Sequence, residues 1–109
     1  MDTVFHCSTT ESLAITDAKV TNLLGDETVQ IQSVAVVVDA PAVIDAAATS
    51  HRETIAAVLD AGATFCVCSN ALRGANSSLA DLPDGAEAVA SGVGELTRRQ
   101  NEGAAYVRL

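Results

Sequence analysis

The sequence predicts one α/β domain over residues 1–109, in which an open, mainly parallel sheet of about five strands lies in a three-layer α/β/α arrangement. Two observations predict this fold class. Short β-favouring runs alternate along the whole chain with segments of helical periodicity. One run, "SVAVVVD" at 33–39, is apolar without alternation, which is typical of a strand covered on both faces in a parallel sheet.

Five segments have strand character, and helical segments separate them. The first strand is expected in "TVFHC" and the third in "TFCVC", both short and rich in β-branched or aromatic residues. A turn signal, Pro83-Asp84-Gly85, precedes the fourth strand. The five predicted strands are 3–7, 33–39, 64–68, 86–91 and 104–109.

Two capping boxes predict where helices begin. Ser8-Thr9-Thr10-Glu11 and Ser50-His51-Arg52-Glu53 both fit the S-x-x-E pattern, in which the serine caps the first turn. Pro41 is expected at the start of another helix, and Gly25 at the end of the first one. The predicted helices are therefore one between Ser8 and Gly25, two at 41–48 and 51–61, a short helix or turn ending near Leu82, and a last one in "VGELTRRQNEG".

Charge and composition exclude several kinds of partner. Fourteen acidic residues against six basic ones give a net charge of −8, so phosphate-rich nucleic acid and anionic membrane surfaces would be repelled. Abundant acids with a single lysine, Lys19, favour a protein adapted to high salt. There is no long apolar run and no basic-then-apolar leader, so we expect a cytoplasmic protein without a membrane span.

In open parallel sheets, ligands and reactive groups lie beyond the carboxyl ends of the strands. This rule selects a small set of candidates from the sequence. They are His6 and Cys7 after the first strand, Asp39 after the second, Cys68 to Arg73 after the third, and Ser91 to Glu95 after the fourth.

Three kinds of chemistry fit the two neighbouring cysteines, Cys66 and Cys68, poorly. Their Cα atoms would lie about 7 Å apart on a strand, too far for a disulfide. Neither paired C-x-x-C knuckles nor H-x-x-x-H spacing is present, so we predict no metal site and no cofactor. The loop from Cys68 to Arg73 is one residue shorter than the phosphate-binding loop of cysteine-dependent phosphatases.

The remaining hypothesis is a single reactive thiol on Cys68. It is expected where a strand ends and a helix begins, so backbone N–H groups near Asn70 would stabilise an anionic sulfur, with Arg73 as the nearest cation. His6 is a candidate proton shuttle or, alternatively, a structural hydrogen-bonded residue. Cys66 and Cys7 are expected to be core residues.

The pattern C-x-N-x-L-R in "CSNALRG" resembles the DsrE/DsrF-like (YchN-like) family. The first strand "VFHCS", the segment "VVVDAPAV" and, above all, the C-terminal "SGVGEL" followed by Q-x-EG-x-AY-x-R are similar to that family as well. The chain departs from the pattern at Ala71, where threonine is common, and at Asp39-Ala40.

The resemblance implies a small α/β protein that assembles as a homotrimer or homohexamer and relays sulfur as a persulfide. By this resemblance Cys68 would be the catalytic cysteine, with Asn70 beside it, and donor and acceptor proteins would be partners. From their strand-end positions, Arg73 and His6 are expected to join Asn70 in binding the substrate. The alternative is a non-catalytic oligomeric module that binds a small ligand or regulates another protein, with Cys68 incidental.

Overall fold

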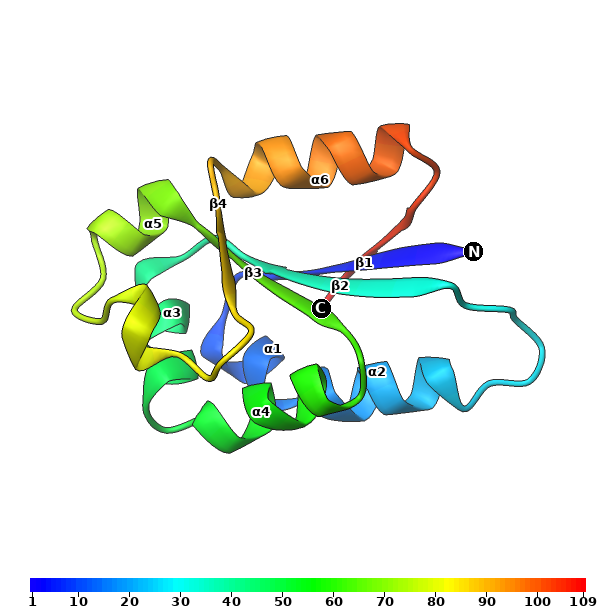
Figure 1. Ribbon diagram of the computed structural model, residues 1–109, viewed down its shortest axis with the longest axis horizontal. Coiled ribbons are helices and arrows are strands. Elements are labelled where there is room, and N and C mark those ends of the chain that lie inside the picture. Colours follow the sequence, from blue (N-terminus) through cyan, green and yellow to red (C-terminus); the bar gives the residue numbers. More distant parts are fainter.

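A five-stranded, wholly parallel sheet forms the centre of the molecule, as the computed structural model of residues 1–109 describes it (Figure 1). The strand order is β4-β3-β2-β1-β5, so β2 is central and β4 and β5 are the edges. The strands are β1 (Asp2–Cys7), β2 (Ser33–Val38), β3 (Thr64–Cys68), β4 (Glu87–Val89) and β5 (Ala105–Arg108). The predicted fold class is confirmed, and the fifth strand pairs with the first.

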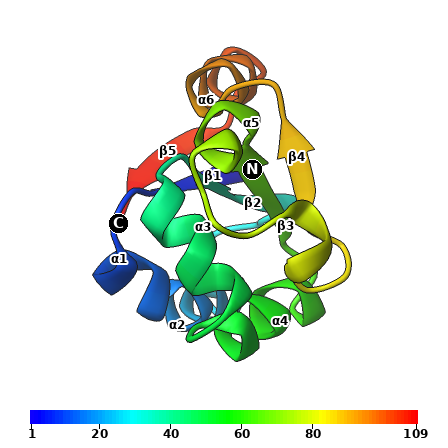
Figure 2. The same ribbon diagram turned by 90° about the vertical axis from the view of Figure 1, so that its left-hand side faces the viewer.

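Helices cover both faces of the sheet (Figure 1). The face under α1–α4 carries the large core, to which Phe5, Val36, Phe65 and Val67 contribute. The opposite face is covered by α6 alone and holds a smaller cluster that includes Val4, Val37, Cys66 and Leu96. Alternate residues of a strand point to opposite faces, which is why apolar residues at successive positions of β2 all become buried. The end-on view separates the two layers clearly (Figure 2).

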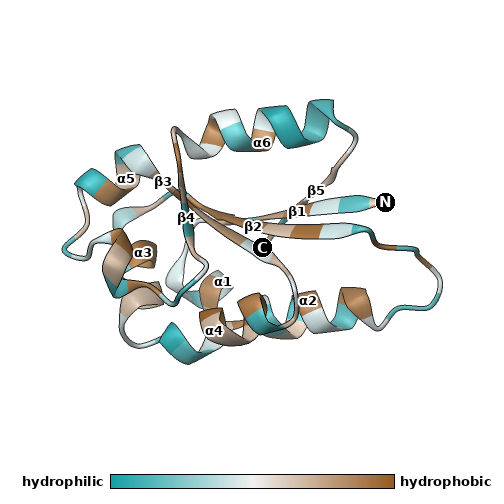
Figure 3. Cartoon of the chain, viewed as in Figure 1, coloured by the Kyte–Doolittle hydropathy of each residue, from teal (hydrophilic) through white to brown (hydrophobic).

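The helices are short. They are α1 (Thr10–Ala14), α2 (Thr16–Leu24), α3 (Pro41–Ala48), α4 (Arg52–Asp60), α5 (Ser69–Arg73), the 3₁₀ turn η1 (Leu79–Asp81) and α6 (Gly92–Asn101). Hydropathy follows the layers: the strands are mostly apolar, whereas α6 is largely hydrophilic on its outer side (Figure 3). A bilayer span would need a longer and more apolar helix than any in this fold.

The prediction that Ser8 caps one long helix is wrong in two respects. Thr9 is the cap, and its side chain accepts from the N–H of Ser12. The helix is also broken at Ile15, whose backbone leaves the helical region, so that α1 and α2 are separate. Ser8 is thereby free to hydrogen-bond with side chains from β1 and the end of β2.

The prediction that Ser50 caps the helix α4 is wrong as well. His51 occupies the N-cap position of α4 without a side-chain cap, and the Ser50 hydroxyl contacts the imidazole Nδ1 of His51 instead. The fourth strand is shorter than predicted, because Ser91 leaves it to cap α6 by accepting from the N–H of Gly94 at 3.0 Å.

Candidate functional site

The carboxyl ends of the parallel strands meet at one edge of the sheet, the edge that faces the viewer in Figure 2. Cys7 and Cys68 end β1 and β3, and Asp39 directly follows β2. Ser91, two residues beyond β4, begins α6 at the same edge. The strand-end candidates of the sequence therefore gather where the parallel topology requires.

Cys68 is the last residue of β3 and the N-cap residue of α5. Only 7% of its surface is exposed. Gly92, the first residue of α6, packs directly against it: a Cβ built on Gly92 would lie 3.6 Å from the Cβ of Cys68 and 2.9 Å from the Cβ of Asp39. The N-terminus of the ten-residue helix α6 thus closes over Cys68 and Asp39 together.

Asn70 and Arg73 lie beside Cys68 in the chain but hydrogen-bond to each other. The Arg73 guanidinium donates to the side-chain oxygen of Asn70, and both residues are exposed. No hydrogen bond joins either side chain to the sulfur of Cys68.

His6 lies in a different cluster at the same edge. Its Nε2 is 2.7 Å from Oδ2 of Asp39 and 3.1 Å from Oγ of Ser8, and its Nδ1 is 2.6 Å from the hydroxyl of Tyr106 on β5. Ser8 in turn donates to Oδ1 of Asp39 at 3.0 Å. His6 is 8% exposed, and both nitrogens of its buried imidazole have hydrogen-bond partners.

The hydrogen-bond donors in this cluster follow from its chemistry. A carboxylate only accepts, so Nε2 carries a proton and donates it to Asp39. In the neutral imidazole Nδ1 is then an acceptor, and it receives the O–H of Tyr106. Ser8 and Asp39 share one ring nitrogen, so Ser8 cannot be the nucleophile of a Ser-His-Asp triad, which needs the two partners on opposite nitrogens.

Cys66 faces the other side of the sheet. It is 1% exposed and belongs to the small cluster beneath α6. Burial raises the pKa of its thiol to about 11, although the nearby Arg99 guanidinium acts in the opposite direction. Arg99 itself donates to the buried carboxylate of Glu95 at 2.7 Å, and Arg98 also pairs with Glu95.

Cys7 is a core residue, as predicted. It has no exposed surface and packs in the large cluster with Phe5 and Leu13. Burial raises the pKa of its thiol, and the S–H donates a weak hydrogen bond to the carbonyl of Thr9. All three cysteines are free thiols.

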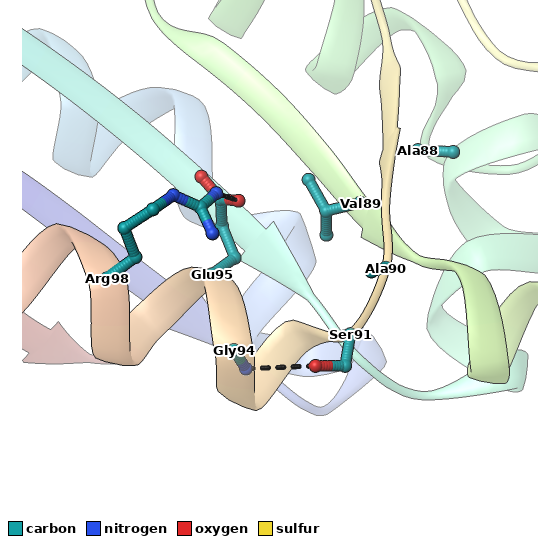
Figure 4. Close-up of a pocket in the computed structure, with 7 residues that line it drawn as sticks. All are labelled: Ala88, Val89, Ala90, Ser91, Gly94, Glu95 and Arg98. Carbon is teal, nitrogen blue, oxygen red and sulfur yellow. Dashed lines mark hydrogen bonds and ion pairs between the residues drawn. The ribbon is translucent and has the colours of Figure 1, made fainter.

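A hollow of about 340 Å³ lies between β4 and the start of α6 (Figure 4). Its lining includes Ser91, Gly94, Glu95 and Arg98, and the Arg98 and Glu95 side chains lie against each other at its wall. Cys68, His6 and Asp39 do not line it. No cluster of three or more His, Cys, Asp or Glu side chains has metal-binding geometry.

Two contributors to the carboxyl-terminal end of the sheet, Ser8 and Tyr106, are not predicted in these roles from the sequence: Ser8 fits a capping box, and Tyr106 an ordinary strand. Tyr106 reaches His6 only because β5 pairs with β1, a neighbour relation that the order of elements does not specify. Gly92 lies within the predicted candidate range from Ser91 to Glu95, but its close approach to Asp39 and Cys68 depends on how α6 packs.

Replacing Gly92 with alanine is expected to lower the free energy of unfolding by about 1–3 kcal/mol, because the new methyl group would overlap Asp39. Urea unfolding would measure the change. Gly25→Ala is the control: Gly25 ends α2 at negative φ, and its Cβ would be 3.3 Å from the Thr21 carbonyl oxygen, a less severe approach than the 2.9 Å at Gly92. A Gly92→Ala variant as stable as that control would contradict the tight packing of α6 on the sheet edge.

Among solved structures, the chain has a neighbour that matches over nearly its whole length. No protein-family model matches the chain, and no curated protein is similar to it. The chain is similar to the structure of a protein of unknown function, MTH1491 from Methanobacterium thermoautotrophicum, at 31% sequence identity and a TM-score of 0.78. The match covers 99% of this chain and 98% of that one.

Proposed function

We propose that this chain, which belongs to the same family as MTH1491, a protein of unknown function, is a small sulfur-relay protein that carries sulfur as a persulfide on Cys68. The proposal rests on the geometry at the carboxyl ends of the strands and on the resemblance of "CSNALRG" to the DsrE/DsrF-like family. The observation that carries the proposal is the position of Cys68: it ends β3, it is the N-cap residue of α5, and Gly92 at the start of α6 packs against its Cβ. The positive end of a helix dipole stabilises an anion placed there, and a thiolate or persulfide is such an anion.

The Asp39 carboxylate next to Gly92 would disfavour an anionic sulfur if its charge were free. Its two oxygens instead accept from Ser8 and His6, both on the side of β1 and away from β3. Under this proposal His6 holds the Asp39 carboxylate on the β1 side by a hydrogen bond and does not contact the sulfur.

The transfer is an exchange of sulfur–sulfur bonds. The Cys68 thiolate attacks the outer sulfur of a donor persulfide, a new S–S bond forms, and the donor leaves as a thiolate with the electron pair of the broken bond. An acceptor thiolate then attacks the outer sulfur and releases Cys68. Exposed Arg73 and Asn70, next to Cys68, would receive the anionic donor at the mouth of the site.

Exposure of the native protein to polysulfide, followed by a thiol-blocking reagent and intact mass measurement, tests the proposal. Wild type is expected to gain one sulfur atom that a reductant removes. The Cys7→Ala/Cys66→Ala variant keeps Cys68 as its only thiol and should gain the same mass. Cys68→Ser should lose at least about nine-tenths of the gain, since the remaining thiols are buried and have raised pKa values.

The proposal fails if Cys68→Ser gains sulfur to the same extent, or if wild type gains none. The latter result favours a second candidate, an oligomeric module that binds a small ligand or regulates another protein. One observation supports that candidate: the hollow between β4 and α6 is formed without Cys68.

A further inference from the structure

The hydrogen bonds around His6 form a continuous chain from the end of the central strand β2 to the outer strand β5. Asp39 follows the central strand β2, His6 lies on β1, and Tyr106 lies on β5. The two links are short, 2.7 Å from Oδ2 of Asp39 to Nε2 of His6 and 2.6 Å from Nδ1 of His6 to the hydroxyl of Tyr106. Both ring nitrogens are used, one toward a carboxylate and the other toward a hydroxyl.

This order of groups is that of an activated nucleophile. A base within hydrogen-bond distance of a hydroxyl, held on its other side by a carboxylate, is the arrangement that removes a proton from an attacking oxygen. Here the attacking oxygen would be a phenol. The imidazole is buried, whereas Tyr106 is 40% exposed on an edge strand, so the chain of hydrogen bonds ends at a group that reagents can reach.

We propose that Asp39, His6 and Tyr106 form a proton relay that makes the Tyr106 phenol a nucleophile toward activated acyl groups, a covalent modification site separate from Cys68. The phenol oxygen attacks the acyl carbon, a C–O bond forms, and the leaving group departs with the electron pair of its broken bond. The phenol proton moves to Nδ1 of His6, and Asp39 stabilises the imidazolium. His6 then returns the proton to the leaving group or to water.

Composition makes this site easy to observe. Tyr106 is the only tyrosine, so an acetyl group on tyrosine identifies one position without ambiguity. The probe is N-acetylimidazole, and peptide mass spectrometry follows the acetylation of Tyr106 over time. N-acetyltyrosinamide in the same solution gives the rate of a phenol without a relay.

Wild-type Tyr106 is expected to react at least about tenfold faster than N-acetyltyrosinamide, and roughly 100-fold faster than Tyr106 in His6→Gln, because general-base assistance is worth that much. In the Asp39→Asn variant, Tyr106 should be acetylated at least about tenfold more slowly than in wild type, because the substitution removes the charge that stabilises the imidazolium. Asp2→Asn is the matched control. Asp2 is a carboxylate on the same strand as His6, but it accepts from Ser33 at the other end of β1 and lies outside the relay, so its variant should stay within about twofold of wild type.

A solvent isotope effect separates proton transfer from a structural role of Asp39. Wild type should react more slowly in D2O, and the Asp39→Asn variant should show little difference between D2O and water. The proposal is overturned if wild-type Tyr106 reacts no faster than N-acetyltyrosinamide, or if the Asp39→Asn and Asp2→Asn variants react at equal rates. If the His6→Gln variant fails to fold, the comparison of Asp39→Asn with Asp2→Asn still tests the proposal.

Discussion

Replacing Phe65 with alanine is expected to lower the free energy of unfolding by about 3–5 kcal/mol, the range for large aromatic truncations in a packed core. Phe65 lies on β3, the strand that delivers Cys68, and its side chain has no exposed surface. It is the largest fully buried side chain, within a cluster formed by the sheet and the helices beneath it. The free energy of unfolding of a small domain is only about 5–15 kcal/mol, so the variant should be partly unfolded at elevated temperature.

Urea unfolding with circular dichroism would measure this loss. Val93→Ala is the control, because Val93 is 69% exposed on α6 and its truncation should change stability by less than about 0.5 kcal/mol. If the two variants have equal midpoints and slopes, Phe65 does not anchor the sheet to α1–α4. A lower midpoint with an unchanged slope is the expected pattern.

Much of the fold is predictable because its strongest signals are local. The apolar run of β2 and the glycines after α2 and α4 place elements within a few residues of their observed bounds. The failures are at helix starts. Ser8 and Ser50 both satisfy a capping pattern, but each side chain has a competing partner nearby, a carboxylate and imidazole for Ser8 and an imidazole for Ser50. Capping patterns carry no information about such competition.

The candidate site is predictable only as far as the edge of the sheet. Parallel topology brings His6, Asp39 and Cys68 to one edge, and that much follows from strand order along the chain. Which of them touch depends on lateral strand order and on α6. The sequence cannot say that β5 lies next to β1, which gives His6 a tyrosine partner, or that Gly92 comes between Asp39 and Cys68.

The two cysteines of "TFCVC" are separated by the same geometry. Cys66 belongs to the cluster beneath α6, whereas Cys68, at the turn into α5, packs with the large core. Residues two apart on a strand normally share a face. Cys68 therefore lies where β3 ends and the backbone turns into α5, which directs its side chain away from that of Cys66. The sequence pattern suggests this division but does not determine it.

Cys66 is expected to be about 100-fold less ionised at neutral pH than a thiol of ordinary pKa, because burial raises its pKa from 9.0 to about 11. Ultraviolet absorbance of the thiolate in a Cys7→Ala/Cys68→Ala variant measures this without depending on reagent access. Glu95→Gln should lower the pKa of Cys66 again. The Glu95 carboxylate raises that pKa, and its removal leaves the Arg99 guanidinium free to stabilise the thiolate.

Exchange of a more distant acid, Glu102→Gln at the exposed end of α6, serves as the control for the Glu95 variant and should leave the Cys66 titration unchanged.

The raised pKa of Cys66 also determines how the free energy of unfolding changes with pH. Between pH 9 and pH 11 the unfolded chain loses the Cys66 proton while the folded chain retains it, so stability falls as pH rises. Cys66→Ala should show a shallower decline over that window. A titration midpoint near 9 in the folded protein would contradict the burial of Cys66 beneath α6.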